Sequence, residues 1–313
     1  MAANVRLRGE NAGDRATALH SRWRDLRRGQ VWVAYLCLAP AFLALVIFTI
    51  IPFFQSLYFS LTKYNVLSAP EWRGLDNYRQ LFESKYFWTS LGNTAYYTVA
   101  TIPPKLILGL GLALLLNQKL HGVAFFRLFF YSPVVTAMVA VSVIWLWVYH
   151  PSSGLLNMAL EAVGLPPQRW LLDPRLAMPS LMALGVWKYV GGTMVIYVAA
   201  LQGIPQVYYE AASIDGAGRW QQLWHVTLPM LKPATFYNFV TMAISSFQVF
   251  EQMYIMTEGG PGYATTTVVY EIYREAFQKF HMGYASAMAL TLFVIILLLT
   301  LLNFKVGASD IEY

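Results

Sequence analysis

The sequence predicts an all-α polytopic membrane protein, and three observations lead to that prediction. Of the 313 residues, 57% are hydrophobic and 12% are charged, whereas about 25% of the residues of a soluble domain carry a charge. The apolar residues gather in blocks long enough to cross a bilayer, which takes about 20 helical residues. The blocks are Leu-rich runs, such as LTLFVIILLLTLL at residues 290–302. They lack the apolar and polar alternation of a membrane β-barrel.

Six apolar blocks lie in the region 31–305, which we interpret as one transmembrane domain. The predicted spans cover residues 31–59, 95–116, 125–149, 177–201, 235–257 and 285–304. Prolines 52, 103 and 104 lie inside these blocks, where a membrane helix tolerates them as kinks because neighbouring groups or water bond the freed carbonyls. Residues 1–30 and 306–313 are expected to be tails.

The basic residues predict the orientation in the membrane. Residues 1–30 contain seven arginines, and cytoplasmic segments of membrane proteins are enriched in Lys and Arg. Both termini are therefore expected in the cytoplasm, with the chain crossing the plasma (bacterial inner) membrane several times in contact with lipid. The first apolar block is too long for the core of a signal peptide, which has 7–15 residues.

The residues present argue against several other functions and kinds of site. The acidic residues of the tail (Glu10, Asp14, Asp25) argue against an organelle presequence, and we expect no nucleic acid as a partner. Cys37 is the only cysteine, so neither a disulfide within the chain nor a cysteine-based metal site is expected. We predict no metal site and no catalytic residue.

The most informative connection lies between the fourth and fifth predicted spans, at residues 203–234. It contains EAASIDGAGRWQQLWHVTLP at residues 210–229. Pro205 suits the first position of a helix, and we predict a short helix over residues 206–215. Ala211 and Ala212 give this helix a face of low relief that another protein can approach closely.

A reversal and a second short helix are expected to follow. Gly216 allows the reversal because glycine adopts positive φ at little cost. The second helix passes through Trp220 and Trp224 and is expected to lie against the membrane and to end at Pro229. These residues predict a rigid helix-turn-helix beneath the bilayer.

The spacing within this connection resembles the cytoplasmic signature of binding-protein-dependent ABC importer permeases. That signature is Glu-Ala-Ala, three residues, Gly, nine residues, an aliphatic residue, one residue and Leu-Pro. Valine stands here for the usual isoleucine. The matching residues are Glu210, Ala211, Ala212, Gly216, Val226, Leu228 and Pro229.

Shorter stretches are similar to one branch of the family, the permeases for sugars and related polyols. They are GLDNY at residues 74–78 and FEQMYIMTEGGPGYATTT at residues 250–267. The Gly-Gly-Pro-Gly turn inside the second stretch either ends the fifth span or contacts an external binding protein. The resemblance runs from the first span onward and implies a carbohydrate substrate.

The resemblance implies a type I ABC importer permease fold with a cytoplasmic coupling helix that docks in a groove of an ATPase subunit. It also implies a second homologous permease subunit, two ATPase subunits and an extracytoplasmic solute-binding protein as partners. The residues expected to take part in coupling are Glu210, Ala211, Ala212, Asp215, Gly216, Val226, Leu228 and Pro229.

This chain is not expected to hydrolyse ATP itself. A phosphate-binding loop of the form GxxxxGK[ST] needs a Gly-Lys pair, and the sequence contains none. We therefore expect no cofactor in this chain, with ATP and Mg bound by the partner ATPase.

Polar residues within the spans are candidates for the substrate pathway. Charged residues in membrane helices usually face a cavity or a partner, and Lys105, Lys188 and Glu251 are of this kind. In the family, the middle of the third, fourth and fifth spans lines the pathway. The candidate pathway residues are Thr136, Lys188, Tyr189, Ser245, Ser246, Gln248, Glu251 and Gln252.

Alternatives remain open at these positions. Each polar residue can instead form a hydrogen bond between packed helices. Lys188 and Glu251 can pair with each other, or Glu251 can lie near the outer surface. Lys188 and the glycines at 191 and 192 depart from the maltose-type pattern, which leaves open whether this subunit or its partner holds the sugar.

Two other functional classes explain fewer features. An ion-coupled secondary transporter or channel predicts inverted repeats and ion sites at mid-membrane, and the sequence shows no convincing internal repeat. A membrane-bound enzyme needs clustered catalytic groups, whereas the five histidines are scattered over the tail and the connections.

Overall fold

The computed structural model describes residues 32–118 and 121–307, without the side chains of residues 306 and 307. The predicted N-terminal tail and most of the C-terminal tail lie outside the described residues. The chain divides into two compact units, Met1–Tyr58 and Phe59–Tyr313.

A single helix makes up the described part of the first unit and continues to Ser60. It runs over Trp32–Ser60 and contains the π-helical turn η1 (Val46–Ile50) followed by α2 (Ile51–Ser60). The helix continues through Pro52, as expected for a membrane helix. Its most apolar 18-residue window has a mean hydropathy of 2.5, as expected for a helix that spans a membrane.

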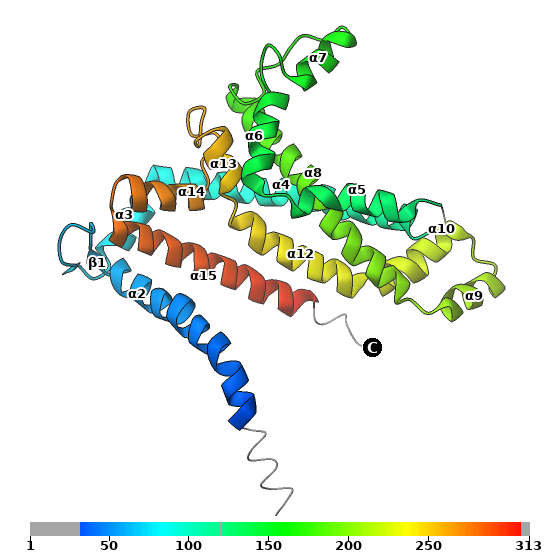
Figure 1. Cartoon of the computed structure of the whole chain (residues 1–313), viewed down its shortest axis with the longest axis horizontal. Helices are drawn as coiled ribbons and strands as arrows, with labels where there is room; N and C mark the ends of the chain where they lie inside the picture. The colour runs from blue at the N-terminus through cyan, green and yellow to red at the C-terminus, as the bar shows by residue number, and fades with distance from the viewer. Residues whose placement is uncertain (1–31, 119–120, 308–313) are drawn as a thin grey trace, which may run out of the picture. The chain divides into compact units, whose positions relative to one another are not determined.

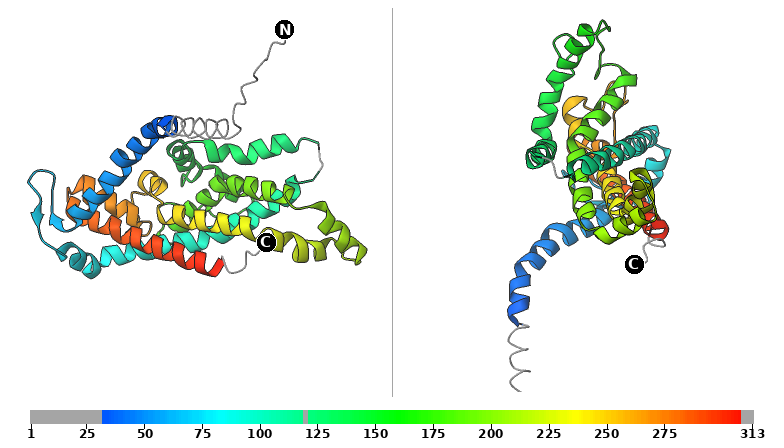
Figure 2. Two further views of the ribbon diagram at one scale, coloured as in Figure 1. Left: turned by 90° about the horizontal axis from the view of Figure 1, so that it is seen from below. Right: turned by 90° about the vertical axis from the view of Figure 1, so that its right-hand side faces the viewer.

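Three long helices of the second unit have the length and composition of membrane spans: α4 (Lys85–Leu116), α8 (Pro174–Gln202) and α15 (Met282–Gly307). Of the most apolar window of α8, 61% is buried, and α8 packs against α4, α5 and α12 (Figures 1 and 2). Small residues permit these contacts: a Cβ on Gly109 of α4 would lie 2.6 Å from Cγ2 of Thr193 in α8. Helix α8 is therefore the centre of this unit.

The third predicted span is broken in the middle. Helix α5 (Val123–Val135) and helix α6 (Met138–Val148) meet at an angle of 99°. Thr136 between them is extended, with φ −76° and ψ 140°, and follows Pro133, whose ring disfavours a continuous helix. The chain turns at Thr136, so the residues of the third predicted span form two helices, and the span itself stays a prediction.

The fifth predicted span is also two helices. Helix α12 (Lys232–Phe247) ends before Gln248, and α13 (Glu251–Met256) begins after Phe250, whose φ is −141° and ψ is −57°. Among the described residues, four helices satisfy the length and composition of a span, or five if the bent pair α5–α6 counts as one. The count of six spans therefore stays a prediction, whereas the all-α membrane fold is confirmed.

The connections contain short elements. An antiparallel pair, β1 (Thr62–Lys63) and β2 (Glu71–Trp72), precedes α3 (Asp76–Glu83). Helix α7 (Leu155–Ala162) lies between α6 and α8. Helix α14 (Val268–Tyr273) and the π-helical turn η3 (Arg274–Gln278) lead into α15.

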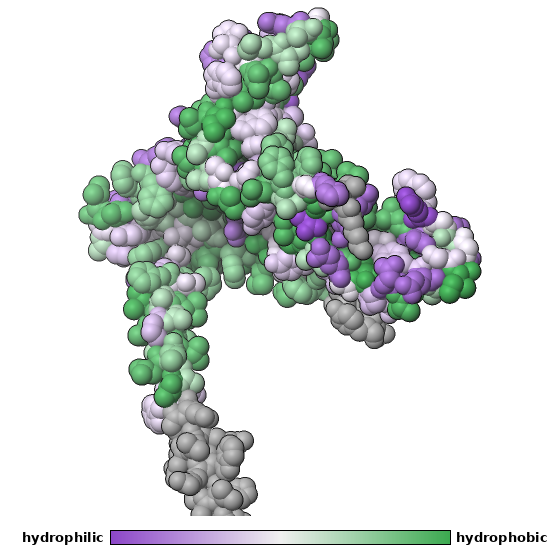
Figure 3. Space-filling model, turned by 45° about the vertical axis from the view of Figure 1, so that its right-hand side comes forward, coloured by the Kyte–Doolittle hydropathy of each residue, from purple (hydrophilic) through white to green (hydrophobic). Residues whose placement is uncertain are grey.

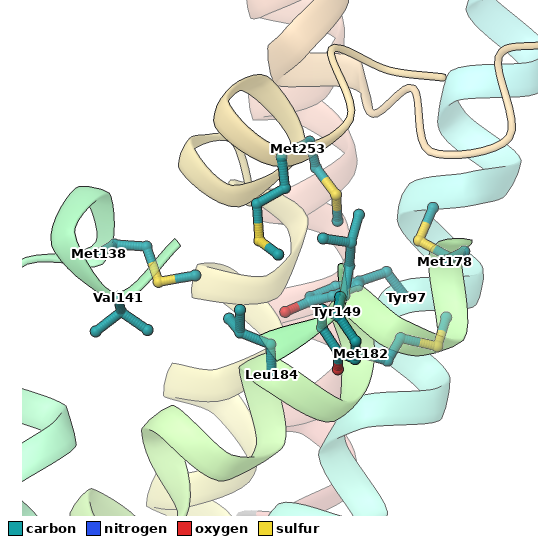
Figure 4. Packing of buried hydrophobic residues seen from close by; sticks show 10 residues of the cluster. Tyr97, Met138, Val141, Tyr149, Met178, Met182, Leu184 and Met253 are labelled. Carbon is teal, nitrogen blue, oxygen red and sulfur yellow. The ribbon is translucent and has the colours of Figure 1, made fainter. Parts of the chain in front are cut away.

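The largest buried cluster joins α4, α6, α8 and α13, and Figure 4 shows its side chains in close contact. Five of its ten members are methionines, whose unbranched side chains adapt to changes in packing. Outside this cluster, apolar side chains cover much of the visible surface (Figure 3), as expected for helices that face lipid. The cluster consists of Tyr97, Met138, Val141, Tyr149, Met178, Leu181, Met182, Leu184, Met253 and Met256.

Candidate functional site

The predicted coupling segment forms two short helices joined by a reversal at Gly216. Helix α9 covers Gln206–Ile214, one residue shorter than predicted. Gly216 has φ +78°. Its N–H donates to the carbonyl of Ser213 (3.1 Å), and the N–H of Ala217 donates to the carbonyl of Ala212 (2.8 Å). This pair of bonds is a Schellman motif, so the reversal is built on the glycine that the sequence indicated.

The second arm is continuous from α10 (Arg219–Gln222) through the π-helical turn η2 (Leu223–Thr227) to α11 (Leu228–Met230). The expectation that Pro229 ends this arm is wrong, because Pro229 lies inside α11. The N–H of Leu228 bonds to the carbonyl of Leu223. This wider π-helical spacing is a local adjustment that accommodates the missing N–H donor of proline.

Side chains brace the two arms against each other. Nε2 of Gln222 donates to Oγ of Ser213 (2.9 Å) and to the carbonyl of Ala217 (3.2 Å). The hydroxyls of Tyr209 and Thr227 lie 3.0 Å apart. Sequence reasoning missed these braces, because a glutamine in a polar connection has no distinguishing pattern.

Most of the predicted coupling residues are on the surface. Glu210, Ala211, Asp215, Gly216 and Pro229 are exposed, and the other three are partly buried. A shallow pocket of about 250 Å³ lies in the bend of the segment. It is lined by Ala212, Asp215, Gly216, Ala217, Gln221, Gln222, His225 and Val226.

The second predicted site is a cavity of about 320 Å³ between α4, α8 and the break that separates α12 from α13. Most of the candidate pathway residues lie around it, although only Tyr189 comes from the predicted fourth span. The lining consists of Tyr97, Lys105, Tyr189, Ser245, Ser246, Gln248, Val249, Phe250, Glu251 and Gln252.

Two predicted pathway residues do not line this cavity. Lys188 is 2% exposed, and its Nζ donates to the carbonyl oxygens of Pro133 (2.8 Å) and Thr136 (2.7 Å). Thr136 donates its own hydroxyl to the carbonyl of Ser132 (3.0 Å). Lys188 and Thr136 thus belong to the break between α5 and α6, which matches the alternative of hydrogen bonds between packed helices.

Residues of α4 complete the cavity. The sequence marks Lys105 as a charged residue within a span, but Lys105 is not among the predicted pathway residues. Tyr97 is not among them either. The four-residue spacing of Tyr97, Thr101 and Lys105 places them on one helical face, which is the signal that could have found them. The hydroxyl of Tyr97 accepts a hydrogen bond from Nε2 of Gln252 (2.7 Å), so it ties α4 to α13.

Tyr189 lies between two lysines. Its ring centroid is 5.5 Å from Nζ of Lys105 and 5.3 Å from Nζ of Lys188. Aromatic faces attract cations at such distances. The cavity therefore combines an aromatic face, hydroxyl and amide groups, two nearby cations and the carboxylate of Glu251.

A group of charged residues lies outside the predicted spans, between α14 and α15. Nζ of Lys279 donates to Oε1 of Glu275, and Nδ1 of His281 lies 2.9 Å from Oε2 of Glu275. Burial raises the pKa of Glu275, but the hydrogen bonds from Lys279 and His281 outweigh burial, so that the pKa lies below its usual value. Burial raises the pKa of the neighbouring Glu271, an effect that Arg274 opposes. The sequence reasoning assigned no role to this group.

Comparison with known proteins identifies the family. Residues 92–307 match the model of the family described as "Binding-protein-dependent transport system inner membrane component". The chain is 38% identical over 296 residues to the probable ABC transporter permease protein YesP of Bacillus subtilis, covering 93% of this chain and 94% of that protein.

Two further relatives have a substrate in their names. The chain is 33% identical to the sulfoquinovosyl glycerol transport system permease protein SmoG of Agrobacterium fabrum, covering 91% of this chain and 93% of that protein. It is 32% identical to the trehalose/maltose transport system permease protein MalF of Thermococcus litoralis, covering 90% and 96%.

A solved structure has the same fold. It is a chain of a bacterial alginate ABC transporter in complex with an alginate pentasaccharide-bound periplasmic protein. The TM-score is 0.79 at 25% identity, and the match covers 90% of this chain and 96% of that chain.

Proposed function

Because the chain belongs to the family of binding-protein-dependent transport system inner membrane components, we propose that it is a permease subunit that imports a sugar or related polyol. The energy comes from ATP hydrolysis on a separate ATPase subunit. The single observation that carries this proposal is the braced helix-turn-helix of α9 and α10, which presents the family signature on its surface.

The proposed assembly contains this chain, a second homologous permease, two ATPase subunits and an extracytoplasmic solute-binding protein. The family match over residues 92–307 supports it. We place the assembly in the plasma (bacterial inner) membrane, with both termini and the coupling segment 203–234 in the cytoplasm. ATP and Mg belong to the ATPase subunits, and this chain needs no cofactor of its own.

In the proposed mechanism, the coupling segment transmits force because it is stiff. Closure of the ATPase subunits displaces Glu210 and the turn at Gly216 as one body, since the hydrogen bonds of Gln222 connect the two arms. Helix α12 follows this segment after Leu231 and ends at the cavity. The movement of the segment therefore reaches the cavity and opens it to alternate sides of the membrane.

The proposed substrate class rests on the cavity and on the relatives. Two of the relatives are named for their transport systems, one for sulfoquinovosyl glycerol and one for trehalose and maltose. The cavity offers hydroxyl and amide groups of Ser245, Gln248 and Gln252 for sugar hydroxyls. The aromatic faces of Tyr189 and Phe250 are suited to sugar C–H groups.

The coupling role is tested with the complete assembly in proteoliposomes. Gly216→Pro should insert and assemble normally, because nothing lies within 4 Å of a Cβ at this position, but proline cannot adopt φ +78°. We expect the loss of substrate-stimulated ATPase activity and of uptake. Gly218→Ala is the matched control, because Gly218 has φ −71°.

Retained stimulation in Gly216→Pro would contradict the coupling role. Uptake measurements in the same proteoliposomes distinguish the proposed importer from the rival class, an ion-coupled secondary transporter. Uptake driven by a proton or sodium gradient in the absence of ATP would overturn the proposed function.

A further inference from the structure

The cavity between α4, α8 and α12 contains a buried cation without a counter-ion in direct contact. Lys105 is 4% exposed. Its Nζ has one hydrogen bond in the described part of the chain, a long one of 3.5 Å to Oγ1 of Thr101. Its other contacts are the rings of Tyr97 (5.9 Å) and Tyr189 (5.5 Å). A buried charge without a paired partner is costly, so this arrangement favours an anionic group in the cavity.

A second donor in the same cavity is also unsatisfied. Ser246 is 3% exposed, and its hydroxyl has no hydrogen-bond partner among the described residues. Ser246 and Lys105 both line the cavity. Two buried donors from two different helices therefore lie around one space.

The charged groups around the cavity are not in direct contact with one another. Lys105 lines the cavity, whereas Lys188 does not, although both ammonium groups lie over the Tyr189 ring. The partners of Lys188 are two carbonyl oxygens, which are uncharged. Glu251 is the one carboxylate in the lining, and it is an exposed residue. Lys105 is therefore the one cation in the lining, and no ion pair among the described residues joins it to Glu251.

From these observations we propose that the cavity binds an anionic group of the transported carbohydrate, with Lys105 as its charge partner and Ser246 as a hydrogen-bond donor. The group is a carboxylate, a sulfonate or a phosphate ester, since each presents charged oxygens that accept from an ammonium and a hydroxyl. This inference rests on the proposed function, namely that the chain imports a carbohydrate.

The proposal also assigns roles to the rest of the lining. Gln248 and Ser245 are exposed to the cavity and are available to the uncharged hydroxyls of the same molecule. Gln252 is held by Tyr97 and therefore shapes the wall. Lys105 is the specificity-determining residue because it provides a cation in the lining itself.

The test uses the complete assembly in proteoliposomes with the solute-binding protein of its own system. Uptake is measured for matched pairs of labelled saccharides: a uronic acid disaccharide and its carboxyl-reduced form, a sugar phosphate and the free sugar, and a sugar sulfonate and the corresponding neutral sugar. The pairs distinguish the three anionic groups. We expect the wild type to import the acidic member of at least one pair at least tenfold faster than its neutral partner.

Substitutions then assign the preference to this cavity. Lys105→Met should lower uptake of the acidic saccharide at least tenfold and change uptake of a neutral saccharide less than twofold. Lys105→Arg should retain the preference, and Ser246→Ala should lower acidic uptake severalfold. Lys305→Met is the control, because Lys305 is exposed near the end of α15.

Each of the following outcomes would contradict either the inference or the proposed function. ATP-dependent import of neutral saccharides alone would overturn the inference and leave the proposed function intact. The absence of ATP-dependent uptake for every saccharide would overturn the proposed function. An equal loss of acidic and neutral uptake in Lys105→Met, with normal assembly, would make Lys105 structural. If Lys105→Met does not assemble, unchanged acidic uptake in Ser246→Ala and Lys105→Gln contradicts the inference.

Discussion

Lys188 of α8 donates a hydrogen bond to the carbonyl oxygen of Pro133 (2.8 Å) at the end of α5. The same ammonium donates to the carbonyl oxygen of Thr136 (2.7 Å), on the other side of the break. The carbonyl of Pro133 also accepts from the N–H of Thr136 (3.3 Å), so the buried lysine adds a second donor there and supplies the donor for the carbonyl of Thr136. Lys188 of α8 therefore stabilises the bend between α5 and α6.

Removal of this lysine should destabilise the bent span. In Lys188→Met, the carbonyl of Thr136 loses its donor and the carbonyl of Pro133 keeps only the N–H of Thr136, and an unsatisfied buried polar group costs about 1–3 kcal/mol. We expect a lower midpoint of thermal unfolding in detergent and a lower yield of assembled complex. Lys305→Met, on an exposed position, should match the wild type. An unchanged midpoint in Lys188→Met would contradict the structural role.

The close approach of α5 and α8 depends on Gly191. A Cβ at this position would lie 1.9 Å from the carbonyl oxygen of Phe130, so Gly191→Ala must separate the helices. Overpacking of this kind costs about 1–3 kcal/mol. The neighbouring Gly192→Ala is the control, because its Cβ would meet only Cγ1 of Val134 at 3.8 Å. Thermal unfolding of the two variants should differ clearly, and equal midpoints would contradict this packing.

The brace of the coupling segment should matter for transmission. Gln222→Ala removes the donor to Ser213 and Ala217 and about 1 kcal/mol of hydrogen-bond free energy, which corresponds to about a fivefold change in an equilibrium. We expect severalfold weaker stimulation of ATPase activity by substrate, with unchanged basal activity. Gln206→Ala, an exposed residue at the start of α9, is the control. Equal stimulation in both variants would exclude a role for the brace.

The ion pairs of Glu275 should make stability depend on pH. The pKa of Glu275 in the folded protein lies below its usual value, so its contribution is complete above the unfolded pKa of about 4.3. The contribution disappears as the pH falls through the lowered folded pKa. Thermal unfolding should therefore separate the wild type from Glu275→Gln by about 1 kcal/mol near pH 7, and the difference should shrink as the pH falls below about 4.3. A difference that grows on acidification would contradict this assignment.

Some parts of the candidate sites could be predicted from the sequence, because they depend on local chemistry. The turn at Gly216 is one, since positive φ favours glycine wherever the surrounding chain lies. Ser245, Gln248 and Gln252 are also among the pathway residues that the sequence predicts. The structure places them around a cavity because the helix ends at Phe247.

Lys188 and Lys105 show the limit of such reasoning. Both are lysines within apolar segments, and local sequence did not determine which one lines the cavity. The neighbours decide it: α8 meets the break after Pro133 through Lys188, whereas Lys105 of α4 lies beside the break between α12 and α13. These contacts join residues far apart in the chain, so their pattern is not contained in any one segment.

The amino-acid sequence alone was enough to predict an all-α membrane protein and two short helices joined by a reversal at Gly216, because hydropathy, glycine and motif spacing act over short stretches. Only the tertiary structure decided where the third and fifth predicted spans break. It also decided which polar side chains satisfy carbonyls and which remain open to a ligand. Those outcomes follow from the close packing of α4, α5 and α12 against α8, where each buried donor must find a partner from another helix.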